Sequence, residues 1–176
     1  MSRRSASYLD PTRTTPLGTL RYAIEFYAAA IATYDALRRQ GVPVAPVPVN
    51  YLLGHAIELA LKAYLLEHGA TLEHTKRDLG HNLVACLAEA EAAGLTDKMG
   101  LDDDDRELIA AFNNLYADKQ FEYIETGPKN FPAFRLLQPF AESLLLETVK
   151  AIPFGKRLLE REAGKFLLRT NDGSDE

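Results

Sequence analysis

The chain has a single cysteine, Cys86, among 176 residues, and it has no long apolar run. One cysteine excludes an intramolecular disulfide and favours a reducing compartment. No segment approaches the roughly 18 apolar residues that a membrane-spanning helix needs. The basic N-terminal residues are not followed by an apolar segment, so a secretory signal is not expected. We therefore predict a cytoplasmic protein with no membrane partner.

The sequence also lacks the common motifs of cofactor-dependent enzymes. It has no glycine-rich phosphate loop, no ligand pairs at zinc spacing and no nucleophile elbow. We expect no cofactor and no metal. The four aspartates at 102–105 are better explained by N-capping and the helix dipole than by a cation site. Cys86 lies among alanines and leucines, which predicts a small core residue.

The formal net charge of −5 argues against broad, nonspecific binding to nucleic acid. A local basic patch is still compatible with that total. Near the C-terminus, basic residues recur every four positions and would form a stripe on a helix. Such a stripe could contact phosphate backbones or an acidic partner, or it could be an ordinary solvated face. Its members are Arg157, Arg161, Lys165 and Arg169.

Helix formers and a period of three to four residues dominate the centre of the chain. The predicted long helices cover residues 17–40, 49–68, 81 or 82–93, 102–123 and 133–151. Because their connections are short, we expect antiparallel neighbours. The predicted fold class is all-α, an up-and-down bundle of about five long helices.

Proline and glycine mark the segments between these helices. An extended connector is expected at 42–49, loops at 70–80 and 125–132, and a turn at 96–101. Residues 156–169 could form a sixth helix or, because of Gly164, two short strands. The predicted organisation is a flexible segment at 1–16, the bundle at 17–152 and a C-terminal extension at 153–176 with a disordered end.

Two short segments carry the chemistry-bearing residues. His55, Glu58 and Lys62 fall on one face of the second predicted helix, and Gly80 and His81 open the third. Glu58 and Lys62 have the spacing of a helix-stabilising pair worth about 0.2–0.5 kcal/mol. The same pair could instead bind a ligand or lie between subunits. His55 could transfer protons with Glu58, or simply donate to it between packed helices.

Together, these segments resemble the HEPN superfamily, small helical-bundle proteins of prokaryotes named for a proposed nucleotide-binding role. The resemblance extends over about residues 17–151. It is carried by Ala56–Ala63, by Gly80–Leu83, and by the aromatic pattern from Leu115 to Tyr123. It implies a helical bundle that often dimerises. The ligand-binding or interface residues would be His55, Glu58, Lys62, Tyr116 and Tyr123.

Many members of that family are ribonucleases or toxin components in toxin–antitoxin and phage-defence systems, often paired with a nucleotidyltransferase. The ribonuclease members share an arginine and a histidine that are separated by four to six intervening residues. This chain departs from that pattern, because only three residues separate Arg77 from His81. The resemblance thus favours a homodimeric module, associated with RNA or a nucleotide, without strong catalysis.

Two other functions stay open. In the first, Arg77 and His81 form a metal-independent ribonuclease site. A histidine can activate a 2′-hydroxyl near neutral pH, and an arginine can stabilise the charge on phosphorus. Against this, His81 lies near a helix start and could simply cap or pack there. In the second, the chain is a structural dimerisation scaffold.

Overall fold

The computed structural model describes residues 13–41, 47–118, 121 and 132–166, with side chains up to residue 162. Within these residues every regular element is a helix, which confirms the all-α class. The helices are α1 (Pro16–Arg39), α2 (Val47–Glu67), α3 (Leu72–Arg77), α4 (Leu83–Ala92), α5 (Leu95–Met99), α6 (Asp103–Tyr116), α7 (Phe134–Ala151) and α8 (Gly155–Phe166).

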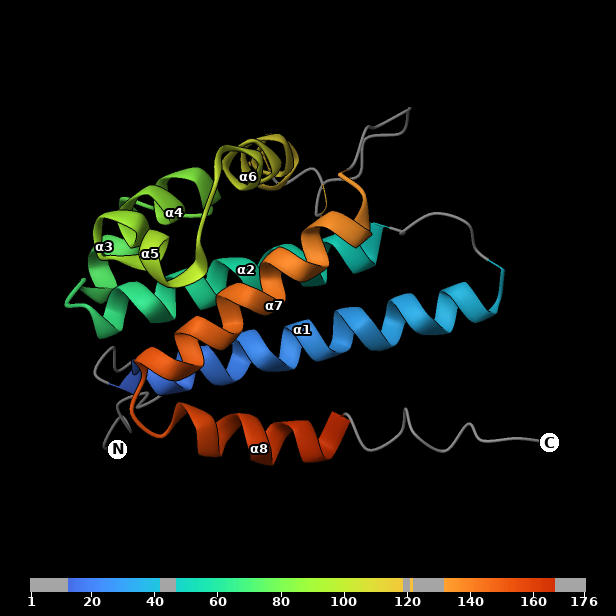
Figure 1. Ribbon diagram of the computed structural model, residues 1–176, viewed down its shortest axis with the longest axis horizontal. Coiled ribbons are helices and arrows are strands. Elements are labelled where there is room, and N and C mark those ends of the chain that lie inside the picture. The colour runs from blue at the N-terminus through green and yellow to red at the C-terminus, as the bar shows by residue number, and fades with distance from the viewer. Residues whose placement is uncertain (1–12, 42–46, 119–120, 122–131, 167–176) are drawn as a thin grey trace, which may run out of the picture.

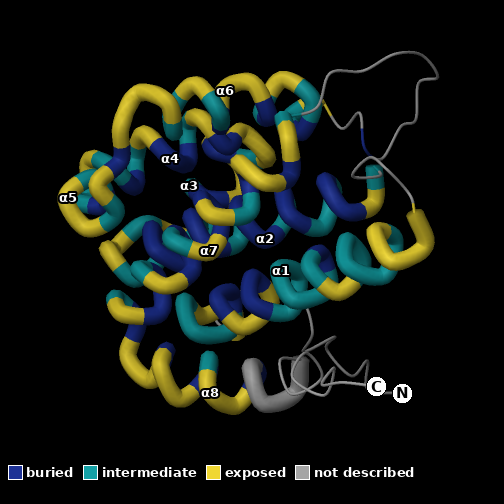
Figure 2. The backbone as a smooth tube through the Cα atoms, turned by 45° about the vertical axis from the view of Figure 1, so that its right-hand side comes forward, coloured by how far each residue is buried: buried dark blue, intermediate teal, exposed yellow. Residues whose placement is uncertain are grey.

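The centre of the fold is α2, which is buried on nearly every side (Figure 2). Such a helix must be surrounded by other elements, because an all-round apolar surface cannot face water. In Figure 1, α1 runs antiparallel to α2, α7 crosses α2, and α8 lies along the outer side of α1. Among the described residues, no helix has the combination of length and apolar character that crossing a bilayer requires.

The second half of the bundle is not a simple up-and-down arrangement. Figure 1 shows α6 nearly end-on while α1 and α2 lie across the view, so α6 crosses the long helices. Two polar contacts tie α6 to α4. The Leu83 N–H at the start of α4 donates to Asn113 Oδ1 at 2.7 Å, and Arg106 Nη2 lies 2.7 Å from Glu91 Oε1.

Two short helices were missed in segments where we expected a loop and a turn. Helix α3 begins after Thr71, whose side chain accepts a hydrogen bond from the His74 N–H. Helix α5 is bounded by Gly94 and Gly100, both with positive φ. Neither helix is long enough to show a hydrophobic period, and N-caps and left-handed glycines form them locally.

The boundaries of two long helices also differ from those expected. Helix α2 begins at Val47, within the predicted extended connector, because Pro48 is tolerated in a first helical turn that needs no N–H from it. Helix α6 ends at Tyr116 and not near residue 123. Phe121 packs back against Phe112, with ring centroids 5.6 Å apart, a contact that a helix continued to residue 121 would not allow.

The C-terminal segment, for which a sixth helix and two short strands were both predicted, forms a helix. Residues 155–166 form α8, so two strands about Gly164 were the wrong alternative. Leu158 and Glu162 are buried where α8 packs against α1 and α7. Asp102 and Asp105 form a capping box at the start of α6, with Asp103 and Asp104 in its first turn, which confirms the predicted capping role of this segment.

A glycine on α2 sets the close approach of α6. A Cβ at Gly54 would lie 2.6 Å from Tyr116 Cδ2 and 2.8 Å from Phe112 Cε1. We expect Gly54→Ala to lower the free energy of unfolding by about 1–3 kcal/mol, because two aromatic rings must move. Denaturant unfolding measures this change. Gly18→Ala on α1, where an added Cβ meets only the Thr15 hydroxyl, is the control. Equal effects of the two substitutions would contradict the account.

An ionic clamp joins α3 to α4. His74 Nδ1 lies 2.7 Å from Asp78 Oδ2, and its Nε2 lies 2.8 Å from Glu89 Oε2. The hydrogen bond to Glu89 and then that to Asp78 raise the pKa of His74. A raised pKa stabilises the fold fully below the unfolded value of about 6.5, and this stabilisation is lost as pH rises through the folded pKa.

We therefore expect wild type to be more stable than His74→Gln in mild acid, and the difference to shrink as pH rises. Denaturant unfolding at a series of pH values measures it. His68→Gln is the matched control, since His68 Nδ1 contacts only a backbone carbonyl, at Tyr64. A difference that stays constant across the pH series would show that the clamp is not ionic.

Candidate functional site

The candidate site is built around a buried carboxylate on α2. The Glu58 side chain is only 3% exposed, and Lys62 Nζ, one turn later, lies 2.5 Å from its Oε1. A buried charge is tolerated only when it is paired and hydrogen-bonded. Because both residues belong to α2, this pair forms within one chain.

Lys62 also positions the segment that precedes α4. Its ammonium group donates to the Gly80 carbonyl at 2.5 Å. Gly80 has a φ of +53°, a left-handed conformation that glycine adopts without steric cost. This turn brings His81 over α2, where its Nδ1 lies 3.0 Å from Glu58 Oε2.

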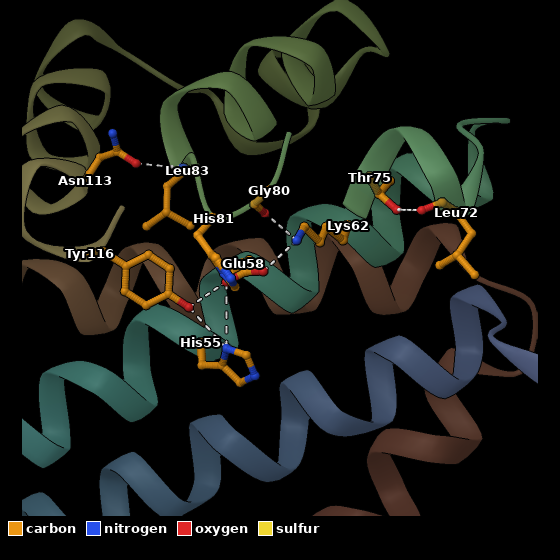
Figure 3. Close-up of polar contacts among 10 residues, drawn as sticks. All are labelled: His55, Glu58, Lys62, Leu72, Thr75, Gly80, His81, Leu83, Asn113 and Tyr116. Atoms are coloured by element: carbon orange, nitrogen blue, oxygen red, sulfur yellow. Dashed lines mark hydrogen bonds and ion pairs between the residues drawn. The ribbon is translucent and has the colours of Figure 1, made fainter. Parts of the chain in front are cut away.

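Tyr116, on α6, reaches the same carboxylate from another side. Its hydroxyl donates to Glu58 Oε2 at 2.6 Å (Figure 3). The close approach depends on Gly54, one helical turn before Glu58, because any Cβ there would collide with the Tyr116 ring. His55 completes the group, with Nδ1 at 3.1 Å from the Tyr116 oxygen and 3.7 Å from Glu58 Oε2. The Glu58 cluster is hereafter His55, Glu58, Lys62, His81 and Tyr116.

Counting protons fixes the direction of these hydrogen bonds. Tyr116 has one hydroxyl proton and gives it to Glu58, so His55 Nδ1 must be the donor to the Tyr116 oxygen. An ionised Glu58 only accepts, so His81 Nδ1 is also a donor. In the neutral ring, each histidine then has an unprotonated Nε2.

The surroundings keep Glu58 ionised. Burial by itself raises the pKa of Glu58, but the contact with His55, the charge of Lys62 and the hydrogen bond from His81 lower it. The net result is a pKa well below the usual range of a carboxyl group. Glu58 is therefore a fixed negative charge that orients its neighbours, and it does not serve as a proton donor.

The cluster is reached from solvent through its histidines. The His81 side chain is 45% exposed, whereas His55 is 26% exposed and Lys62 is 12% exposed. His55 also packs edge-on against Phe26 and parallel to Tyr51, with ring centroids 4.4 and 6.1 Å away. His81 is thus the member of the cluster most accessible to a ligand.

The other predicted site residues are placed elsewhere. Arg77 is on α3, 76% exposed, and its Nη1 lies 2.7 Å from Glu73 Oε1. The structure therefore groups His81 with Glu58 and not with Arg77. Tyr123 and Arg169 lie outside the described residues, as does the side chain of Lys165.

On the predicted basic stripe, the two described side chains are already engaged. Arg157 lies over the Phe154 ring, 5.9 Å from its centroid, and Arg161 Nη2 is 3.0 Å from Glu162 Oε1. Cys86 is a core residue, as we expected, and burial raises the pKa of its thiol to about 12. No group of three or more acidic, histidine or cysteine side chains in the described part of the chain is arranged to hold a metal ion.

Sequence reasoning missed the supporting contacts of the cluster. The Gly80 carbonyl, Gly54 and the packing of His55 on Phe26 were not predicted. Gly54 had a usable signal, since it precedes Glu58 by one helical turn and so lies on the same face. The contact between His74 and Glu89 had no such signal, because the two residues belong to different helices.

Comparisons with protein-family models, with curated proteins and with solved structures gave no match to this chain. The HEPN resemblance accordingly rests on the residues quoted above, and any function drawn from it is a proposal.

We expect Glu58→Gln to lower the free energy of unfolding by about 3–5 kcal/mol, since it leaves the Lys62 ammonium without its carboxylate. Glu73→Gln is the matched control. It removes a carboxylate from another i, i+4 pair, with Arg77, that is exposed and worth about 0–1 kcal/mol. Denaturant unfolding of both variants measures the difference. Similar small losses would show that the Glu58 cluster does not stabilise the fold.

Proposed function

We propose that this chain is a HEPN-like helical module that associates with RNA, and that His81 contacts a phosphate of the bound strand. The observation that supports the proposal most is the position of the His81 ring. Its Nδ1 is held by the buried Glu58, and the ring is nearly half exposed. An imidazole nitrogen that is fixed and accessible can hydrogen-bond to a phosphate oxygen.

The residues that carry the HEPN resemblance support the same proposal. Glu58 and Lys62 come from one segment, Gly80 and His81 from another, and Tyr116 from a third. All five take part in a single connected set of hydrogen bonds. Because the chain has a net charge of −5, we expect contact with RNA at this local site and not over a wide surface.

The hydrogen bonds that Lys62 and Arg77 make within the chain favour binding without strong catalysis. Metal-independent RNA cleavage needs a cation near the histidine to stabilise charge on phosphorus. Lys62 donates to Glu58 and Gly80, and Arg77 pairs with Glu73. Lys62 and Arg77 are thus both committed to acceptors within the chain.

The test is binding of a fluorescently labelled single-stranded RNA, followed by anisotropy without added metal. We expect His81→Ala to weaken binding about tenfold, since a hydrogen bond to a charged group is worth about 1.5–3 kcal/mol. His68→Ala, another exposed histidine, is the control and is expected to bind as wild type does. No binding by wild type, or equal binding by both variants, would refute the proposal.

A second candidate function is a ribonuclease in which Glu58, and not Arg77, assists His81. The unprotonated Nε2 implied by the Glu58 contact favours it, because that nitrogen could act as a general base. The same reactions distinguish the two functions when the RNA is examined on a denaturing gel. Cleavage by wild type and not by His81→Ala would replace the binding module with the enzyme.

The homodimer and the nucleotidyltransferase partner stay predictions of the HEPN resemblance. Lys62 is engaged inside its own chain, so we expect a dimer to pair through other residues. Molar mass from light scattering determines whether such a dimer forms.

A further inference from the structure

The four histidines of the chain differ in what holds their ring nitrogens. Both nitrogens of His74 contact carboxylates, and His55 is covered by two aromatic rings. His68 and His81 are both exposed and form hydrogen bonds only through Nδ1, and the His68 ring also stacks on Tyr64 with centroids 4.1 Å apart. Among the described residues, Nε2 of these two rings has no hydrogen-bond partner, so both present a nitrogen to solvent.

His68 and His81 differ in the acceptor at Nδ1. His68 Nδ1 lies 2.8 Å from the neutral carbonyl of Tyr64, whereas His81 Nδ1 lies 3.0 Å from the Glu58 carboxylate. When Nε2 of an imidazole bonds to an electrophile, positive charge develops on the ring. A carboxylate at Nδ1 stabilises that charge more strongly than a carbonyl does. His81 is therefore the better nucleophile of the two.

The remaining members of the Glu58 cluster suit an anionic electrophile. A bare carboxylate near Nε2 would repel an incoming phosphoryl group. Lys62 compensates the charge of Glu58 from 2.5 Å away, and Tyr116 donates to the same carboxylate. Glu58 can thus stabilise the reacting ring without presenting an uncompensated negative charge to the donor.

We propose that His81 is a phosphoryl-acceptor residue, modified at Nε2 by a small high-energy phosphoryl donor of the phosphoramidate class. The Nε2 lone pair forms the new N–P bond as the P–N bond of the donor breaks. The leaving nitrogen, already protonated in the zwitterionic donor, departs as ammonia with the bonding electron pair. The Nδ1 proton stays hydrogen-bonded to Glu58, so no other base is required. This activity goes beyond the proposed function and does not depend on RNA.

The experiment incubates the full chain with potassium phosphoramidate at mildly alkaline pH. Intact-mass measurement counts the phosphoryl groups added, tandem mass spectrometry finds the modified residue, and heteronuclear NMR tells Nε2 from Nδ1. We expect His81 to be modified at Nε2 faster than His68 in the same molecules. The urea-unfolded chain is the reference, and there we expect the two histidines to react at equal rates.

Substitution of Glu58 tests the cause of this difference. In Glu58→Gln we expect the rate at His81 to fall to that of His68, with circular dichroism confirming that the variant is folded. If the variant is unfolded, the comparison of His81 with His68 in folded wild type decides the matter. Equal rates there, modification at Nδ1, or no modification of His81 would overturn the proposal. RNA binding that persists in such a case would leave the proposed function standing.

Discussion

The arrangement of the site depends on one buried charge, the carboxylate of Glu58. Burying a carboxylate is costly, and here the cost is offset by donors from three parts of the chain: Lys62 on α2, His81 before α4 and Tyr116 on α6. Each donor is in turn held in place by its hydrogen bond to Glu58. A single ionised group thereby fixes how α4 and α6 lie on the central helix.

The need to place donors around Glu58 explains why two glycines, Gly54 and Gly80, stand where they do. Gly54 is needed because α6 must come close enough for the Tyr116 hydroxyl to reach Glu58. The left-handed Gly80 lets the chain turn so that its carbonyl meets Lys62 and the next residue meets Glu58. The side chain left facing solvent is His81, with Nδ1 occupied. The position of His81, and with it any chemistry at Nε2, follows from the hydrogen bonds that the buried Glu58 carboxylate requires.

The sequence predicted what is local and periodic. The 24-residue α1 and the 18-residue α7 were found from their hydrophobic period, and the spacing of Glu58 and Lys62 indicated a pair. Helices α3 and α5 were missed because six and five residues show no period. The meeting of Glu58 with His81 and Tyr116 joins residues 23 and 58 positions apart, so only the packed fold could reveal it.

The central claim is that Glu58 determines which nitrogen of His81 carries the proton. Long-range ¹H–¹⁵N correlation NMR of the folded chain, above the pH range in which histidine titrates, measures this directly. The account predicts that His55 and His81 are both protonated at Nδ1 and unprotonated at Nε2. A His81 ring protonated at Nε2 would mean that its contact with Glu58 does not exist in solution, and it would contradict the account.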